Sequence, residues 1–181
     1  MPLVLLGCGK DDVVTKPILP TPIVYPVRST PENALLYMMM AFENRDSVRT
    51  DSVYAEDYVG TSLDLVDPNP ETLTFTKSDE VHIVGTLARS SSIVATHVLS
   101  IQSSWFRTNY ASNPPGWATI QIPIFAVYVN DVVNGEYQMR IPLSGESWIF
   151  EFTLEPTIPD PSSPTDTTWQ IVRWVESRTN N

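Results

Sequence analysis

The sequence predicts an α+β domain in which helices near the N-terminus pack on a curved, mostly antiparallel sheet of long strands. Two observations carry this prediction. Apolar residues recur every three or four positions in most segments before residue 90, which is typical of helices, and every second position after Ile93, which is typical of strands. Helices followed by a run of antiparallel strands are typical of two-layer α+β domains. The predicted order of elements is α-α-β-α-β-β-β-β.

The first helix is predicted from Thr30 to about Asn44. Thr30 supplies a hydroxyl N-cap, and Pro31 suits the first helical position. One apolar stripe follows, made of Ala34, Leu35, Met38, Ala41 and Phe42. The three consecutive methionines at 38–40 allow two interpretations, a pliable binding face or a helix core with Met38 directed inward. The periodicity favours the core.

Three further elements precede the strand-rich half. Asp46 is expected to cap a short second helix, and Tyr58–Leu65 is predicted as a strand that ends before the prolines of segment 67–70. Thr76, followed by the acids of the first turn, predicts the start of a third helix that runs to about Arg89.

The next two strands follow from alternation and one turn signal. Residues 93–101 alternate, which places His97 on one face with Ala95 and Leu99. Residues 117–133 are predicted as one long strand, bent at Pro123 because proline cannot donate to a sheet. Asn134-Gly135 is a strong hairpin signal, since both residues tolerate positive φ.

The last two strands complete the domain. The returning strand is predicted over residues 136–155, with an irregularity at 143–145. Its second half places four apolar residues on one face: Trp148, Phe150, Phe152 and Leu154. A proline-rich loop over 156–166 then leads to a final strand at 169–176, and residues 177–181 are expected to form a tail.

The N-terminus carries a second kind of signal. Leu5-Leu6-Gly7-Cys8 resembles a bacterial lipobox, in which a signal peptide is cut before a lipid-modified cysteine. The apolar stretch is short and has no basic residue before it, as expected if the start site is placed too late or the chain is truncated. A buried free cysteine is the alternative. Cys8 is therefore the predicted lipid attachment site, and residues 1–8 are predicted as residual signal peptide and lipobox.

Residues 9–29 are expected to act as a tether. Their dense prolines favour an extended polyproline-type chain, which would hold the domain away from a surface. A proline-rich recognition ligand is the alternative. Because Gly9 and not an aspartate follows the cysteine, the expected location is the bacterial cell envelope, with the outer membrane favoured.

Charge and composition exclude several classes of function. The formal net charge is −10 and the pI is near 4.5, which argues against a nucleic-acid partner. A single cysteine allows no internal disulfide and no cysteine-rich zinc site. His82 and His97 lack a second ligand at metal spacing, so no metal and no cofactor are predicted.

Four segments resemble the nuclear transport factor 2-like superfamily, which includes ketosteroid isomerase-like and SnoaL-like proteins. They are Thr30-Pro-Glu-Asn, Ala41-Phe-Glu-Asn-Arg-Asp46, Tyr54-Ala-Glu-Asp-Tyr58 and Trp169-Gln-Ile-Val-Arg-Trp174. The resemblance covers residues 30–176 and implies a cone, in which a curved sheet wraps around the helices and encloses a pocket.

The resemblance also bears on catalysis. Ser62 stands where the isomerases of this superfamily carry their base, and Met38 stands where a helical tyrosine donates to the oxyanion. No catalytic residue is therefore predicted. A slipped alignment, with Asp64 as the base and Tyr37 close to the donor position, is the alternative, since a pocket acid and a tyrosine suffice for general acid–base chemistry.

Six residues are candidates for lining the pocket that the resemblance implies: Tyr58, His97, Trp105, Tyr128, Trp148 and Phe150. Core packing is the alternative for each of them. The predicted function is a non-catalytic envelope lipoprotein whose cone binds a small apolar ligand or a partner protein. An isomerase, cyclase or hydratase that uses the cavity is one alternative, and a homodimerisation or assembly module is another.

Overall fold

The computed structural model describes residues 22–64, 71–139, 147–157 and 167–179. In these ranges the elements follow the order α1 (Pro31–Glu43), α2 (Ser47–Val53), β1 (Tyr54–Asp64), β2 (Thr72–Thr76), α3 (Lys77–Arg89), β3 (Ile93–Ser100), η1 (Gln102–Ser104), β4 (Phe106–Thr108), β5 (Ala118–Ile122), β6 (Phe125–Asp131), β7 (Gly135–Met139), β8 (Ser147–Thr157) and β9 (Thr168–Thr179).

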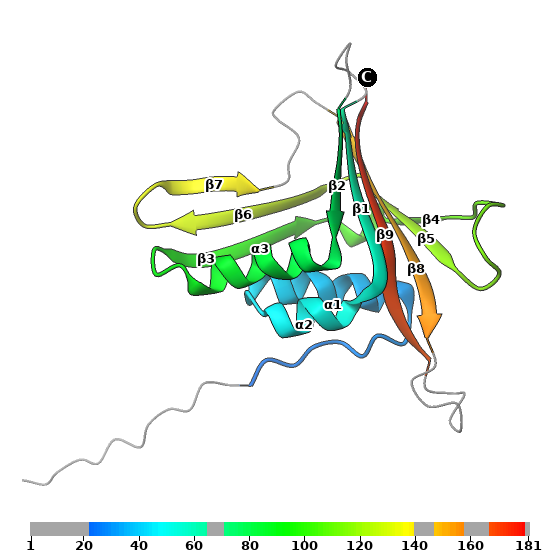
Figure 1. The fold of residues 1–181 in the computed structure, drawn as a ribbon, viewed down its shortest axis with the longest axis horizontal. Helices are drawn as coiled ribbons and strands as arrows, with labels where there is room; N and C mark the ends of the chain where they lie inside the picture. Colours follow the sequence, from blue (N-terminus) through cyan, green and yellow to red (C-terminus); the bar gives the residue numbers. More distant parts are fainter. Residues whose placement is uncertain (1–21, 65–70, 140–146, 158–166, 180–181) are drawn as a thin grey trace, which may run out of the picture.

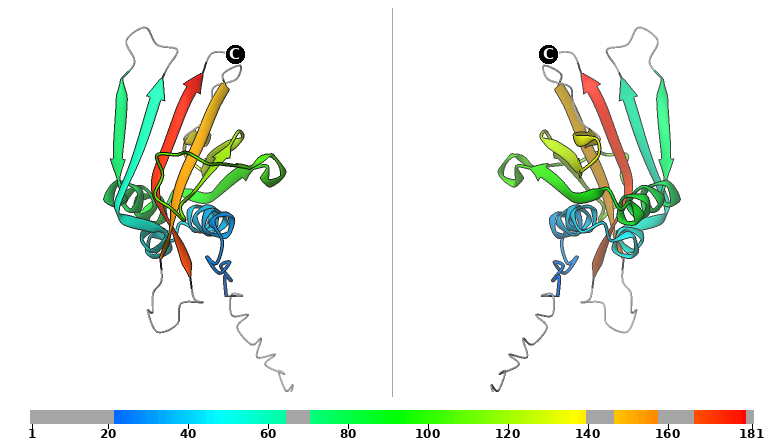
Figure 2. Two further views of the ribbon diagram at one scale, coloured as in Figure 1. Left: turned by 90° about the vertical axis from the view of Figure 1, so that its right-hand side faces the viewer. Right: turned by 90° about the vertical axis from the view of Figure 1, so that its left-hand side faces the viewer.

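The strands form two open sheets. The larger has the order β2-β1-β9-β8-β5-β4, and the smaller has the order β3-β6-β7. All strand pairs are antiparallel except β1 with β9. The larger sheet is a curved wall that rises beyond the helices, and the three helices lie against its inner side beneath the smaller sheet (Figures 1 and 2). The predicted α+β class, with helices on a curved and mostly antiparallel sheet, is confirmed.

The helix starts agree with the capping residues of the sequence. The hydroxyl of Thr30 accepts a hydrogen bond from the Asn33 N–H at 3.1 Å, and Asp46 accepts one from the Arg49 N–H at 3.0 Å. Thr76 and Asp79 form a reciprocal capping box at the start of α3. Met38 is fully buried, which confirms the core interpretation for this methionine.

Two strands differ from the prediction at the N-terminal side of α3. β1 begins at Tyr54, four residues before the predicted start at Tyr58. β2 was not predicted, because most of its side chains are exposed and it therefore shows no alternation of buried and exposed residues. It pairs with β1 at the edge of the larger sheet.

Pro123 divides the segment that was predicted as one bent strand. β5 ends at Ile122 and pairs with β8 in the larger sheet, whereas β6 begins at Phe125 and pairs with β3 and β7 in the smaller sheet. Proline has no N–H to donate to a strand ladder, so the chain changes sheets at this position.

The hairpin between β6 and β7 is confirmed. Gly135 has a φ of 79°, and Asp131 pairs with it across the turn. The Asp131 carboxylate accepts hydrogen bonds from the N–H groups of Val133 and Asn134 at 2.8 and 3.3 Å. The expected irregularity at 143–145 lies outside the described residues.

The C-terminal strand is longer than predicted. β9 continues to Thr179, and its last residues pair with both β8 and β1. Residues 177–179, which were expected to belong to a tail, are therefore part of the larger sheet.

Aromatic rings fill the centre of the domain. Phe125 of β6 contacts Phe150 and Phe152 of β8 and Trp174 of β9, with centroid distances of 5.2, 5.9 and 5.4 Å. Phe152 and Trp174 lie 4.8 Å apart. All four side chains are buried, so this cluster joins the two sheets in one hydrophobic core.

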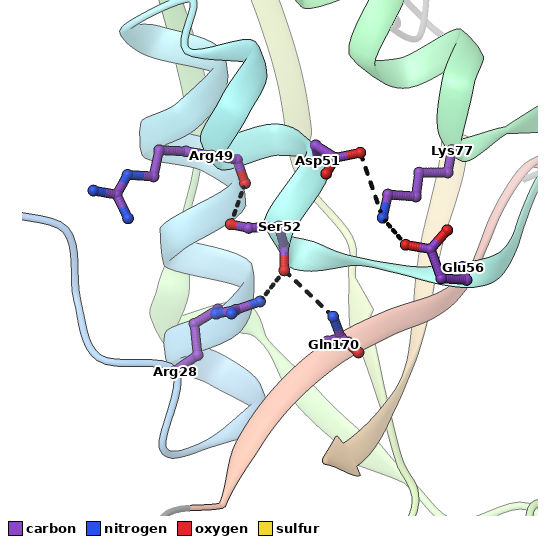
Figure 3. A network of polar contacts seen from close by, with 7 residues as sticks. All are labelled: Arg28, Arg49, Asp51, Ser52, Glu56, Lys77 and Gln170. Atoms are coloured by element: carbon purple, nitrogen blue, oxygen red, sulfur yellow. Dashed lines mark hydrogen bonds and ion pairs between the residues drawn. The ribbon is translucent and has the colours of Figure 1, made fainter. Parts of the chain in front are cut away.

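Part of the segment expected to act as a tether packs on the domain. The Arg28 carbonyl accepts a hydrogen bond from the Trp169 N–H at 2.9 Å, and the ring of Tyr25 contacts that of Tyr37 at 5.0 Å. The Arg28 guanidinium donates to the Ser52 carbonyl at the end of α2, which Gln170 also approaches (Figure 3). The packed part of the chain thus begins before Thr30. None of the described helices is long and apolar enough to cross a bilayer.

Candidate functional site

The six residues predicted to line a pocket do not share one site. Tyr58 and Phe150 are buried in the core, and Trp105 packs against its edge. His97 is exposed, and it pairs across the smaller sheet with Tyr128, which is half-buried. The side chain of Trp148 lies outside the described residues, as does Cys8.

A register shift explains the position of His97. The pairing of β3 with β6 slips by one residue between Ile93 and Ala95. Beyond this irregularity Thr96 is buried and Val98 half-buried, whereas His97 and Leu99 are exposed. A slip of one residue exchanges the two faces of a strand, and nothing in the local sequence marks it.

A buried acid and a phenol lie together between the larger sheet and α3. The Tyr58 hydroxyl donates to Oε1 of Glu80 at 3.1 Å, and the rings of Tyr54 and Tyr58 lie 4.3 Å apart. Glu80 has no exposed surface and Tyr58 only 3%. In the sequence, Glu80 served only as one of the first-turn acids that mark a helix start, so this contact was missed.

This pair has the chemical groups of a general acid–base site, and Tyr58 borders a pocket of about 440 Å³ next to Lys77, but Glu80 does not reach that pocket. A carboxyl group beside a phenol can move a proton to or from a substrate that reaches within hydrogen-bond distance. Both groups are buried here. Ser62, at the expected position of the base, is half-buried on β1 and lies opposite Glu176 of β9. Met38, at the expected donor position, is fixed in the core.

Near Tyr58, a lysine of α3 forms ion pairs with acids of α2 and β1. Lys77, at the start of α3, contacts Glu56 of β1 at 2.6 Å and Asp51 of α2 at 3.4 Å (Figure 3). Burial lowers the pKa of the Lys77 amine, but the two carboxylates more than offset this effect, so the pKa lies above its usual value. The cluster carries net negative charge and connects α2, β1 and the start of α3.

An open apolar groove lies on the other side of α1. We call it the α1 groove, and it has a volume of about 530 Å³. One wall is the N-terminal segment, the floor is the outer side of α1, and the other wall is β3 with η1. Its residues are Val24, Tyr25, Pro26, Leu36, Met39, Met40, Glu43, Val98, Ser100 and Gln102.

The N-terminal wall of the α1 groove is held in place by Tyr25. Its hydroxyl donates to Asp46 at 3.1 Å, and the Arg49 guanidinium lies 5.3 Å from its ring centroid. Burial and the Asp46 carboxylate raise the pKa of Tyr25 to about 12. The phenol therefore stays protonated at neutral pH and keeps this hydrogen bond.

A smaller pocket of about 210 Å³ continues past Leu36 and Gln102. Trp105 lines it, and the Trp105 indole N–H donates to the Ser100 hydroxyl at 2.8 Å. An ion pair between Glu32 and Arg107, at 2.7 Å, lies at its side. Of the five candidates whose side chains are described, Trp105 is the one that lies beside the groove. Within the described ranges, no group of three histidine, cysteine or acidic side chains could hold a metal ion.

Comparison with known proteins shows that the fold is similar to that of several solved structures. No protein-family model matches the sequence, and no curated protein matches it. A solved structure of LinA has a TM-score of 0.52 at 10% identity, over 84% of this chain and 86% of that chain. A conserved protein from Planctomyces limnophilus has a TM-score of 0.51 at 11% identity, over 82% and 92%.

A third similar structure is that of a protein assigned to a named superfamily. It is a nuclear transport factor 2-like superfamily protein from Salmonella enterica serovar Typhimurium, with a TM-score of 0.51 at 10% identity, over 82% of this chain and 87% of that chain. Identities this low establish architecture and leave function open. The chain has the α+β fold of the nuclear transport factor 2-like superfamily.

Proposed function

We propose that this protein is a lipid-anchored component of the bacterial cell envelope that binds a small, mostly apolar ligand without transforming it. The α1 groove is the proposed binding site. The observation that carries the proposal is a contrast between two places in the fold. Aromatic side chains fill the centre of the domain, whereas an apolar groove of ligand size stays open on α1.

The size and lining of the α1 groove support this role. Small-molecule sites typically have volumes of about 300–1,000 Å³ and are mostly apolar with a few polar groups. The groove falls in this range, and Ser100 and Gln102 supply polar groups beside its apolar walls. Met39 and Met40 belong to its floor, and methionine side chains adapt to the shape of a ligand.

An enzyme of the isomerase, cyclase or hydratase kind is the second candidate. The Tyr58–Glu80 hydrogen bond favours it, since the two groups could act as an acid–base pair. Burial argues against it, because Glu80 has no exposed surface and does not line the pocket of about 440 Å³ that Tyr58 borders with Glu56 and Lys77. A partner protein, including a second copy of the chain, is an alternative occupant of the groove.

Titration with the neutral fluorescent dye Nile red tests the groove. We expect the dye to bind the wild-type protein, and Met40→Asp to weaken binding at least about tenfold, because a carboxylate on the floor would have to be desolvated. Val48→Asp is the matched control, since Val48 is also an apolar helical residue but is 75% exposed on α2 and is not among the residues that line the groove. Equal weakening in the two variants, or no binding by the wild type, would refute the proposed site.

Membrane partitioning tests the anchor. The natural precursor, expressed in bacterial cells, should sediment with membranes, and Cys8→Ser should release it because the thiol that accepts the lipid is gone. Ser103→Ala, on η1, is a control that keeps Cys8. If the Cys8→Ser variant still sediments with membranes, the lipid attachment at Cys8 is wrong.

A further inference from the structure

We propose that the ligand of the α1 groove is an amphipathic cation: an apolar body that carries an ammonium or guanidinium group, held at Glu43. This inference rests on the proposed function, because it names the chemical class of the ligand for the same groove. It is carried by the charge, hydrogen bonding and helical position of Glu43.

Glu43 is held at the groove by the edge of the smaller sheet. β3 is an edge strand in the order β3-β6-β7, and the N–H of Val98 donates to Oε1 of Glu43 at 3.1 Å. This bond joins the end of α1 to β3 and keeps the carboxylate beside the apolar lining. One of its oxygens is used in this way, and a carboxylate has further acceptor sites for a ligand.

Among the described residues that line the α1 groove, Glu43 is the only charged one. Among the described residues, Lys77 pairs with Asp51 and Glu56, and Arg107 pairs with Glu32, and neither of these ion-pair groups involves Glu43. Arg45 lies two residues further along, but its guanidinium donates to the Ile93 carbonyl. The groove therefore presents a single negative charge against an apolar surface.

The position of Glu43 in its helix strengthens this preference. Glu43 is the last residue of α1, and the last turn of α1 contains no basic residue. The C-terminal end of a helix carries partial negative charge, which disfavours a carboxylate and favours a cation. A bound ammonium group would thus be attracted by both the Glu43 carboxylate and the end of α1.

The same arrangement disfavours other amphipathic molecules relative to a cation. A fatty acid would bring a second carboxylate against Glu43, and a like-charge contact of this kind disfavours binding. A neutral alcohol would gain the apolar contacts but not the charge interaction. The expected order of affinity for one chain length is amine, then alcohol, then carboxylate.

Three probes of equal chain length test this order: octylammonium, octanol and octanoate, titrated by calorimetry into the whole protein at low salt. We expect octylammonium to bind about three- to tenfold more tightly than octanol, the range for one partly exposed charge contact supported by a helix end. Octanoate should bind more weakly than octanol. Molar salt should reduce the difference, because it screens exposed charges.

Two variants separate the role of Glu43 from net charge. Glu43→Gln keeps a side-chain oxygen that can accept from the Val98 N–H, and it should bring octylammonium and octanol to equal affinity without weakening octanol. Glu136→Gln removes the same charge from an exposed position on β7 and should keep the preference. Unfolding temperatures establish that both variants are folded.

The results distinguish this inference from the proposed function. If octanol and octylammonium bind the wild type equally, the cationic class is wrong and the apolar binding site stands. If the preference survives Glu43→Gln, or disappears equally in Glu136→Gln, the assignment to Glu43 is wrong. If neither octanol nor Nile red binds, the proposed function itself fails.

Discussion

Replacing Phe125 with alanine is expected to lower the free energy of unfolding by about 3–5 kcal/mol, the range for removing a fully packed aromatic side chain. Phe125 is buried on β6, where its ring contacts Phe150, Phe152 and Trp174 of the larger sheet. Its removal would leave a cavity at the junction of the two sheets. Neighbouring rings on well-paired strands could fill this cavity only in part.

Denaturant titration of purified protein measures this loss. Since single domains are stable by about 5–15 kcal/mol, the variant should show a large shift of the unfolding midpoint while still folding. Phe106→Ala is the matched control, because Phe106 is a strand phenylalanine with half of its surface exposed on β4. We expect the control to lose much less. Similar losses in both variants would mean that Phe125 does not join the two sheets as described.

The helices could be predicted from the sequence because their signals are local. The caps Thr30, Asp46 and Thr76 each accept a hydrogen bond from an N–H three residues later, so a short window of sequence contains the whole interaction. The Asn134-Gly135 turn was predictable for the same reason. Strand pairing is non-local, and the sequence could not show that β5 and β6 belong to different sheets.

The site was harder to predict than the fold. His97 was predicted as a pocket residue on one face with Leu99, whereas after the one-residue slip near Ile93 both side chains are exposed. Glu80 was missed because an acid in the first turn of a helix is usually solvated, and only the packing of α3 on β1 brings it to Tyr58. The α1 groove is made by three separate segments, so the sequence could offer a binding face at methionines 38–40 only as an alternative, and the folded chain shows that Met39 and Met40 line the groove.

Gly60 has no side chain and so leaves space for the Tyr58 hydroxyl that donates to Glu80. Replacing Gly60 with alanine is the second change for which we expect a large loss of stability. A Cβ atom at residue 60 would lie 2.6 Å from the Tyr58 hydroxyl oxygen and 3.3 Å from the Cβ of Phe75. Tyr58 is 3% exposed and its ring packs 4.3 Å from that of Tyr54, so the ring cannot shift without disturbing this packing. Overpacking costs about 1–3 kcal/mol, and a displaced Tyr58 hydroxyl would also weaken its bond to Glu80.

Replacing glycine with alanine also has an opposing effect. Alanine reduces the conformational entropy of the unfolded chain, which stabilises the folded protein by about 0.4–1 kcal/mol. The steric cost exceeds this gain, and we expect Gly60→Ala to destabilise the protein by about 2–4 kcal/mol in denaturant titration. Gly85→Ala is a control that we expect to stabilise the protein. A Cβ there would meet the flexible end of Arg89 at 3.1 Å, and alanine in a helix is favoured by about 1 kcal/mol. If Gly60→Ala were neutral, the Tyr58 hydroxyl would be free to move away from β1. The buried pair could then open to a substrate, which would favour the enzymatic candidate over the binding function.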